Sequence, residues 1–286
     1  MDSTRLPQQR FHFDRERLGA LAENNRSAYL AAQPFPHVVM DDFVPDEVLD
    51  EVVAEFPAPR EAQWRAFDNP RERKLASNDD SAMGEATRHL LTELNSAPFV
   101  DFLQRLTDIE GLVPDPHLVG GGLHQIERGG HLNVHADFNR HPATGLERRL
   151  NVLLYLNREW RHEYGGALEL WSRDMSACEA RILPLFNRCL VFSTTSTSFH
   201  GHPEPVACPE GETRKSIALY YYSRDRPPDE GREAHDTLFQ ARPGEQVPET
   251  LAGRASTLGA RFKGAARQVL PPIVLTALRR MRAGRR

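Results

Sequence analysis

Cysteine is scarce in this sequence. Its 286 residues include three, Cys178, Cys189 and Cys208, which is an odd number without a C-x-x-C pair. This pattern argues against a scaffold held by disulfides and against a zinc site built from thiolates. It favours a protein of the reducing cytoplasm.

Long apolar runs are also missing. Residues 1–18 are charged throughout and contain no apolar stretch typical of a secretion signal. The apolar run at 270–278 contains a double proline and is far too short to cross a bilayer. We therefore expect neither a secretion signal nor a transmembrane segment, which again favours a cytoplasmic location.

Charge of one sign does not dominate, because 36 Lys and Arg stand against 40 Asp and Glu, a net charge of −4. This balance is not that of a nucleic-acid-binding protein, so we expect no nucleic-acid partner. Residues 254–286 are an exception, with nine Arg or Lys and no acid. They read either as a packing helix with a solvated basic end or as an arm that contacts an anionic partner or a second subunit. Oligomeric state is left open.

The first part of the chain reads mainly as helix. Residues 13–32 and 46–56 have apolar side chains spaced by three and four, and a further helical region is expected at 85–106. Residues 34–43 predict a short extended run. The polar, turn-rich residues 60–84 predict a long surface connection.

From about residue 118 the pattern changes to short segments rich in β-branched and aromatic residues, separated by Gly, Pro and Asn turns. Many short strands without helices between them predict a jelly roll, also called a double-stranded β-helix. The expected fold class is α+β and mainly β. A helical flanking region at 1–115 would pack on a β core at 116–226, followed by a loop and a basic helical tail at 227–286.

A candidate metal site lies in "HLNVHADFNRH", residues 131–141. Side chains alternate along a strand, so His135 and Asp137 lie on one face, where an imidazole and a carboxylate can reach the same ion. Far downstream, an apolar strand ends in His200, and turns of a barrel can bring it back to Asp137. Two imidazoles and one carboxylate suit Fe(II) better than Mg²⁺ or Ca²⁺.

A basic strand after this site provides a place for a cosubstrate. In "TRKSIALYYYS", residues 213–223, Arg214 and Ser216 share one strand face, while Lys215 points the other way and is the second choice. Arg can grip a carboxylate with two parallel hydrogen bonds, and the Ser hydroxyl adds a third. The strand is therefore suited to hold the far end of a dicarboxylate that chelates the metal.

Taken in this order, these residues resemble the Fe(II)- and 2-oxoglutarate-dependent oxygenases, and within them the bacterial prolyl-hydroxylase-like branch. The resemblance covers roughly residues 118–224. It includes "RRLNVLLYLNREW" and "EYGGALELW", which lie between the His-x-Asp pair and the distal histidine. The N-terminal "PFPHVVMDDFVPDEVLDEVVAEFP" is also similar to the opening of bacterial members.

The resemblance implies a non-haem dioxygenase that hydroxylates an unactivated C–H bond and releases succinate and CO₂. Its cofactors would be Fe(II), 2-oxoglutarate and O₂, with ascorbate as an optional addition. Its substrate would be a small molecule or a peptide. The catalytic iron ligands would be His135, Asp137 and His200, and the cosubstrate would be bound by Arg214, Ser216, Tyr155 and Gln125.

One departure concerns the distal histidine. One residue more than usual separates it from the following Pro-Val, so His202 stays an alternative to His200. The carboxylate of Asp137 is informative in another way, because halogenating relatives replace it with a small residue. Hydroxylation is therefore the expected reaction.

Two other functions remain open from the sequence. A cupin-type metalloenzyme that works without 2-oxoglutarate would keep the histidines but have no use for Arg214 and Ser216. A non-enzymatic jelly-roll module that binds a ligand would merely line a groove with the histidines. Succinate release that depends on 2-oxoglutarate distinguishes the first from an oxygenase, and iron loading distinguishes the second.

Overall fold

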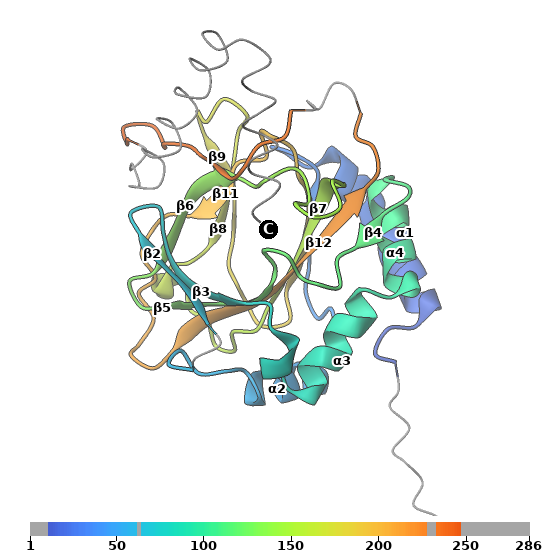
Figure 1. Ribbon diagram of the computed structural model, residues 1–286, viewed down its shortest axis with the longest axis horizontal. Helices are drawn as coiled ribbons and strands as arrows, with labels where there is room; N and C mark the ends of the chain where they lie inside the picture. The colour runs from blue at the N-terminus through green and yellow to red at the C-terminus, as the bar shows by residue number, and fades with distance from the viewer. Residues whose placement is uncertain (1–10, 62–63, 228–232, 247–286) are drawn as a thin grey trace, which may run out of the picture. The chain divides into compact units, whose positions relative to one another are not determined.

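The centre of the protein is one curled, antiparallel sheet of short strands (Figure 1), in a computed structural model that describes residues 11–61, 64–227 and 233–246. In pairing order its main path is β1 (His37–Met40), β10 (Cys189–Ser193), β7 (Glu147–Tyr155), β12 (Thr213–Ser223), β5 (Gly122–Glu127), β3 (Glu72–Ser77), β6 (His131–Ala136), β11 (His200–His202), β8 (Leu168–Trp171) and β9 (Cys178–Ile182). Beside this path, β2 (Arg65–Asn69) pairs with β3, β4 (Val113–Pro114) with β12, and β13 (Leu238–Phe239) with β6. The expected jelly-roll fold, mainly β with a few helices, is confirmed.

The chain divides into two compact units. Residues 1–68 and 72–247 form the first, which contains the helices and all the strands except the last residue of β2, and residues 69–71 and 248–286 form the second. The expected basic helical tail at 254–286 lies outside the described residues. No helix in the described part of the chain is long and apolar enough to cross a membrane.

Within the described residues, the α-helices come from the first part of the chain, where the sequence predicted a mainly helical region. They are α1 (Arg15–Ala31), α2 (Asp46–Ala54), α3 (Glu85–Leu94) and α4 (Ala97–Thr107), with short 3₁₀ turns at Asp80–Ala82 and His162–Tyr164. The carboxylate of Asp14 begins α1 by accepting a hydrogen bond of 2.7 Å from the backbone N–H of Arg17. The single helical region expected at 85–106 is two helices, because Ser96 starts a new helix with a proline in its first turn.

Side-chain alternation on β7 and β12 decides where the core and the site lie. Every second residue faces the helices and packs with them in the main apolar core, which includes Leu150, Val152, Leu154, Ile217, Leu219 and Tyr221. The intervening residues face the inside of the curled sheet. Because the helices cover only the outer face, the inner face is left for polar side chains.

The expected surface connection at 60–84 is wrong. Its second half forms β3, which lies between β5 and β6, with Leu75 opposite Gln125 and Glu72 opposite Leu132. The sequence "ERKLAS" is polar and shows no hydrophobic alternation, because backbone pairing on both sides, rather than apolar burial, holds it in the sheet. As a result Lys74 lines the inner face.

Candidate active site

Three of the predicted site residues meet on the inner face of the sheet. β6 and β11 are neighbours, and His135 lies directly opposite His200. Asp137 follows the last residue of β6, so that Nε2 of His135 is 3.5 Å from its Oδ1 and Nε2 of His200 is 3.4 Å from its Oδ2. Two ligand atoms held at right angles, each about 2.1 Å from one ion, are about 3 Å apart. The observed separations therefore fit three ligands of a single metal ion.

Both imidazoles are turned for metal binding. Nδ1 of His135 donates to the carbonyl oxygen of Asn133, and Nδ1 of His200 donates to that of Ser198, each over 2.9 Å. These bonds fix the proton on Nδ1 and leave the Nε2 lone pairs toward the ion. Burial, reinforced by the neighbouring His200, lowers the pKa of His135 below its ordinary value, which keeps the ring neutral.

The carboxylate of Asp137 is held from behind by two side chains that sequence reasoning missed. Its Oδ2 accepts hydrogen bonds from the guanidinium of Arg148 (2.9 Å) and from the amide of Asn151 (2.8 Å). Burial would raise the pKa of Asp137, but Arg148 and the two histidines hold it well below the ordinary value. The carboxylate is thus anionic and oriented before any ligand binds.

Arg148 is itself locked in place. It is 1% exposed, and its guanidinium carbon lies 3.4 Å from the ring centroid of Tyr220 and 4.6 Å from that of Phe138. A guanidinium stacked on aromatic rings loses little freedom when it forms a hydrogen bond. Arg148 therefore holds the Asp137 carboxylate in position.

A glycine between the two distal histidines allows β11 to approach β6. A Cβ at Gly201 would lie 2.8–2.9 Å from backbone atoms of Leu132, Asn133 and Val134, which cannot move aside without distorting β6. We expect Gly201→Ala to push β11 away, to separate His200 from Asp137, and to weaken Fe(II) binding at least about tenfold. A metal titration checks this.

Gly19→Ala is the matched control for that substitution. Gly19 lies inside α1, where the nearest atom to an added Cβ is a flexible Arg105 side chain at 3.5 Å. Alanine favours a helix over glycine, so this variant should bind iron normally and be no less stable. Normal iron affinity in Gly201→Ala would show that the close approach of β11 is not required.

Comparison with known proteins agrees with this geometry. Residues 121–222, which include all three metal-ligand candidates, match the model of the 2OG-Fe(II) oxygenase superfamily, where 2OG is 2-oxoglutarate. Residues 121–222 are therefore a 2OG-Fe(II) oxygenase domain. No curated protein matches the chain in sequence.

Solved prolyl hydroxylases share the fold of this oxygenase. A prolyl-4-hydroxylase of Pseudomonas putida gives a TM-score of 0.51 at 17% identity, covering 73% of this chain and 100% of its own. A prolyl hydroxylase from Trichoplax adhaerens, in complex with a peptide fragment of the hypoxia inducible factor oxygen degradation domain, gives 0.53 at 19% identity. That match covers 73% of this chain and 91% of the other.

Next to the three metal-ligand candidates of the oxygenase is a small cavity of about 80 Å³ that contains a buried cation, Arg214. Its Nε donates to the carbonyl oxygen of Gly166 over 2.7 Å, and Gly166 has φ +67°, with no room for a Cβ beside the Arg214 side chain. Among the described residues no carboxylate pairs with Arg214. Burial lowers the pKa of this guanidinium, while the nearby Tyr155 acts in the opposite sense. A buried cation without a protein anion is suited to a ligand carboxylate.

The structure brings Ser216 to this cavity and places Tyr155 beside Arg214, but it turns Gln125 away. Ser216 lies opposite Tyr155 across β12 and β7, so both face inward, and the ring of Tyr155 lies 5.0 Å from the Arg214 guanidinium. Gln125 lies opposite Lys215 and shares its outward face. Its amide donates to the carbonyl oxygen of Pro57 and accepts from the hydroxyl of Thr213.

His202 is also buried on the cavity wall, although it lies apart from the other ligand candidates. The pairing of β11 with β6 shifts by one residue after His200, so His202 lies opposite Leu132 rather than opposite Asn133. The group of ligand atoms within 4.8 Å of one another contains His200 and not His202. Burial, with the charges of Arg214 and Lys74, lowers the pKa of His202 well below its ordinary value, so the ring is neutral.

A wider cleft of about 840 Å³ lies over the metal-ligand candidates. His135 and Asp137 are among its lining residues, so a molecule in the cleft would lie beside the ion. Aromatic and charged side chains make up much of the wall, including Phe67, Phe138, Tyr220, Phe239, Arg65, Lys74, Arg140, Glu72 and Asp236. The cleft is within the size range of sites that enclose most of an organic ligand.

Proposed function

We propose that this oxygenase is a hydroxylase whose Fe(II) is bound by His135, Asp137 and His200. The observation that carries the proposal is the set of three ligand atoms that lie close together. The hydrogen bonds that orient these side chains leave Nε2 of both histidines and Oδ1 of Asp137 available to a metal ion. With 2-oxoglutarate and O₂ bound, the iron would supply the oxidation that converts C–H to C–OH, with release of succinate and CO₂. The chain contributes ligand orientation and exclusion of water.

We propose that Arg214 holds the far carboxylate of 2-oxoglutarate, helped by the hydroxyls of Ser216 and Tyr155. Burial raises the pKa of Tyr155, so its phenol stays protonated and can donate a hydrogen bond. His202, as a neutral imidazole on the same wall, adds a further polar contact. This arrangement directs the other, chelating end of the cosubstrate toward the three metal ligands.

For the substrate we propose an extended molecule, a peptide or a small molecule of similar length, bound in the cleft over the metal ligands. Its volume and its aromatic wall support this choice. The Trichoplax adhaerens protein with the same fold was solved with a peptide. The substrate carbon that reacts would lie beside His135 and Asp137.

Anaerobic titration with Fe(II) and 2-oxoglutarate tests the assignment, because the chelate gives a weak visible charge-transfer band. We expect the band in wild type and in His202→Ala, and its loss in His200→Ala. Circular dichroism of each variant checks that the fold is kept. A band lost in His202→Ala and kept in His200→Ala would move the distal ligand to His202. A folded, iron-loaded wild type without a band would contradict 2-oxoglutarate binding.

A further inference from the structure

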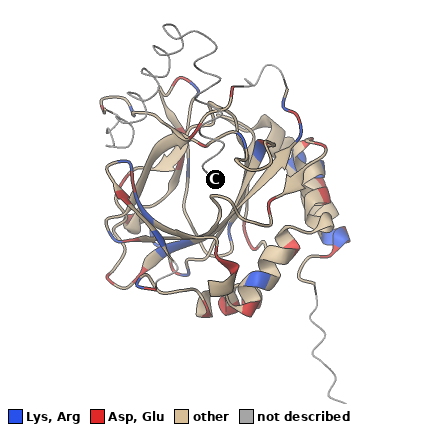
Figure 2. Cartoon of the chain, in the orientation of Figure 1, with Lys and Arg blue, Asp and Glu red and all other residues tan. Residues whose placement is uncertain are grey.

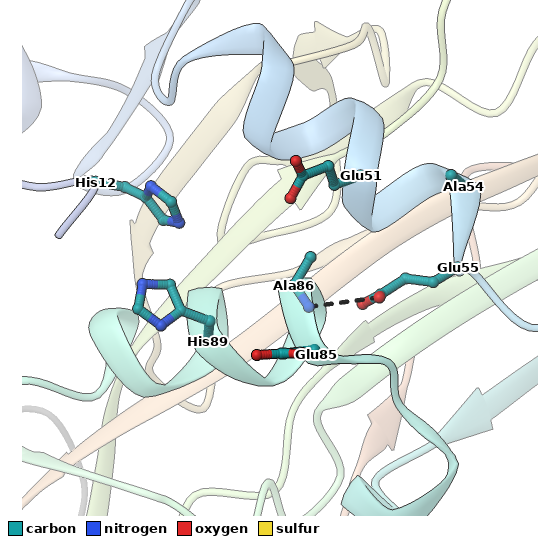
Figure 3. A pocket seen from close by; sticks show the side chains of 7 residues that line it. All are labelled: His12, Glu51, Ala54, Glu55, Glu85, Ala86 and His89. Carbon is teal, nitrogen blue, oxygen red and sulfur yellow. Dashed lines mark hydrogen bonds between the residues drawn. The ribbon is translucent and has the colours of Figure 1, made fainter. Parts of the chain in front are cut away.

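A second cluster of metal-ligand side chains lies on the outer, helical side of the sheet. It consists of His12, just before α1, and of His89 and Glu93, both on α3, with their ligand atoms within 4.8 Å of one another. These three residues are called here the α3 cluster, and two of them, His12 and His89, border a pocket of about 530 Å³ between α2 and α3 (Figure 3). No step of the proposed oxygenase reaction uses them.

The spacing of the α3 cluster fits one ion. His89 and Glu93 are four residues apart and share a helix face, with Nε2 of His89 2.8 Å from Oε1 of Glu93. Nε2 of His12 lies 3.8 Å from the same oxygen. Ligand atoms about 2.05 Å from a tetrahedral ion are about 3.3 Å apart, so the two distances lie on either side of that value.

Glu93 is oriented by the backbone, as metal-bound carboxylates are by their outer contacts. The backbone N–H of His12 donates to both of its oxygens, over 2.9 and 2.8 Å, and that of Phe13 donates to Oε2 over 3.0 Å. The side chain of Glu93 is 4% exposed. A buried carboxylate whose orientation is fixed in this way needs little rearrangement to bind a cation.

The nitrogen of His89 supports the same conclusion. Its Nε2 is buried and makes no hydrogen bond within the described residues, although Oε1 of Glu93 is only 2.8 Å away. A contact this short fails as a hydrogen bond when the ring nitrogen aims beside the oxygen rather than at it. Two ligands of one ion are related in this way, because each aims at the ion between them.

The surrounding charge favours a cation. Glu51, Glu55 and Glu85 line the pocket, and within the described chain no Lys or Arg lines it. Figure 2 shows Asp and Glu gathered on α2 and at the start of α3. The carboxylate of Glu55 already has other partners, because it accepts hydrogen bonds from the backbone N–H groups of Ala86 and Thr87 at the start of α3. Glu51 projects from α2 toward the side of the pocket where His12 and His89 lie (Figure 3).

We propose that His12, His89 and Glu93 bind Zn²⁺, with water or Glu51 as the fourth ligand. Two imidazoles and one carboxylate are a set that Zn²⁺ accepts, and the mixed nitrogen and oxygen donors disfavour Ca²⁺ and Mg²⁺. The ion joins the segment before α1 to α3 and so fastens the helices that cover the outer face of the sheet. It is separate from the oxygenase iron.

Metal counting in the full chain tests the proposal, with the catalytic ligands removed so that the two sites are distinguished. The background variant His135→Ala/His200→Ala keeps Asp137 paired with Arg148. After dialysis against Zn²⁺ we expect two equivalents in wild type, one in the background variant, and none when His12→Ala is added. His12→Ala retains the backbone N–H that orients Glu93, so the fold should be kept. Co²⁺ in place of Zn²⁺ should give intense tetrahedral absorption in the background variant.

Two further variants test whether the bound Zn²⁺ depends on the α3 cluster. His89→Ala in the same background should also remove the remaining equivalent and the rise in melting temperature that Zn²⁺ causes. His117→Ala, which removes an exposed histidine, should change neither. The absence of bound Zn²⁺ in the folded background variant would overturn the proposal and leave the α3 cluster as an ion pair between histidine and glutamate. The result does not depend on whether the oxygenase assignment holds.

Discussion

Asp137→Ala is expected to reduce turnover at least about a thousandfold, because the proposed iron site would lose its single anionic protein ligand. It should also lower the free energy of unfolding by about 3–5 kcal/mol, since it leaves the buried guanidinium of Arg148 without a carboxylate. Succinate formation measures the first effect, and denaturant unfolding of the apoprotein measures the second.

The double variant Asp137→Ala/Arg148→Met separates these two effects. Removing the buried charge together with its partner should restore much of the stability, while turnover stays absent. Recovery of turnover in the double variant, or a single variant with normal turnover at full iron loading, would show that Asp137 is not a ligand. Arg148→Met alone should keep measurable turnover but bind iron more weakly, as expected of a positioning residue.

Arg214→Met is expected to raise the KM for 2-oxoglutarate about a hundredfold, with a smaller change in kcat. A buried, charge-assisted pair of hydrogen bonds contributes about 3 kcal/mol, which corresponds to roughly that factor in affinity. Methionine keeps much of the side-chain volume without the charge. Steady-state assays with 2-oxoglutarate as the varied substrate measure the effect.

Two controls accompany this variant. Arg214→Lys keeps the charge but not the planar fork, so its KM should lie between those of wild type and Arg214→Met. Lys215→Met removes the neighbouring cation on the opposite strand face and should leave KM nearly unchanged. If Lys215→Met had the larger effect, the cosubstrate would lie on the other side of β12.

The metal-ligand candidates and their strands could be predicted from the sequence, because the necessary information is local. Alternation along one strand brings His135 and Asp137 together, and the same rule puts Arg214 and Ser216 on one face. Alternation alone does not say which face is inward for an isolated strand. Gln125 illustrates this limit: its neighbours His124 and Ile126 face the cavity, and it faces away.

The features that the sequence did not reveal depend on contacts between distant segments. From the sequence, Arg148 would be expected to be an exposed charged residue at the start of a strand. In the structure it is buried, because Asp137, Phe138 and Tyr220 surround it. The strand β3 has no apolar pattern of its own and is held by β5 and β6. The α3 cluster requires the approach of residue 12 to α3, which is not encoded by any short motif.

The origin of the cleft wall has a consequence for how this enzyme can change. The residues proposed to bind iron and cosubstrate lie on β6, β7, β11 and β12 and at Asp137 directly after β6, whereas much of the wall comes from β2 and β3, from residues 138–145 and from residues 234–239. At wall positions such as Arg65 and Phe67 on β2, which are absent from the lining of the cosubstrate cavity, substitutions should alter which molecules are accepted while the proposed iron site is kept. The substrate preference can therefore be changed by substitutions in the cleft wall, while the residues proposed to bind iron and cosubstrate are kept.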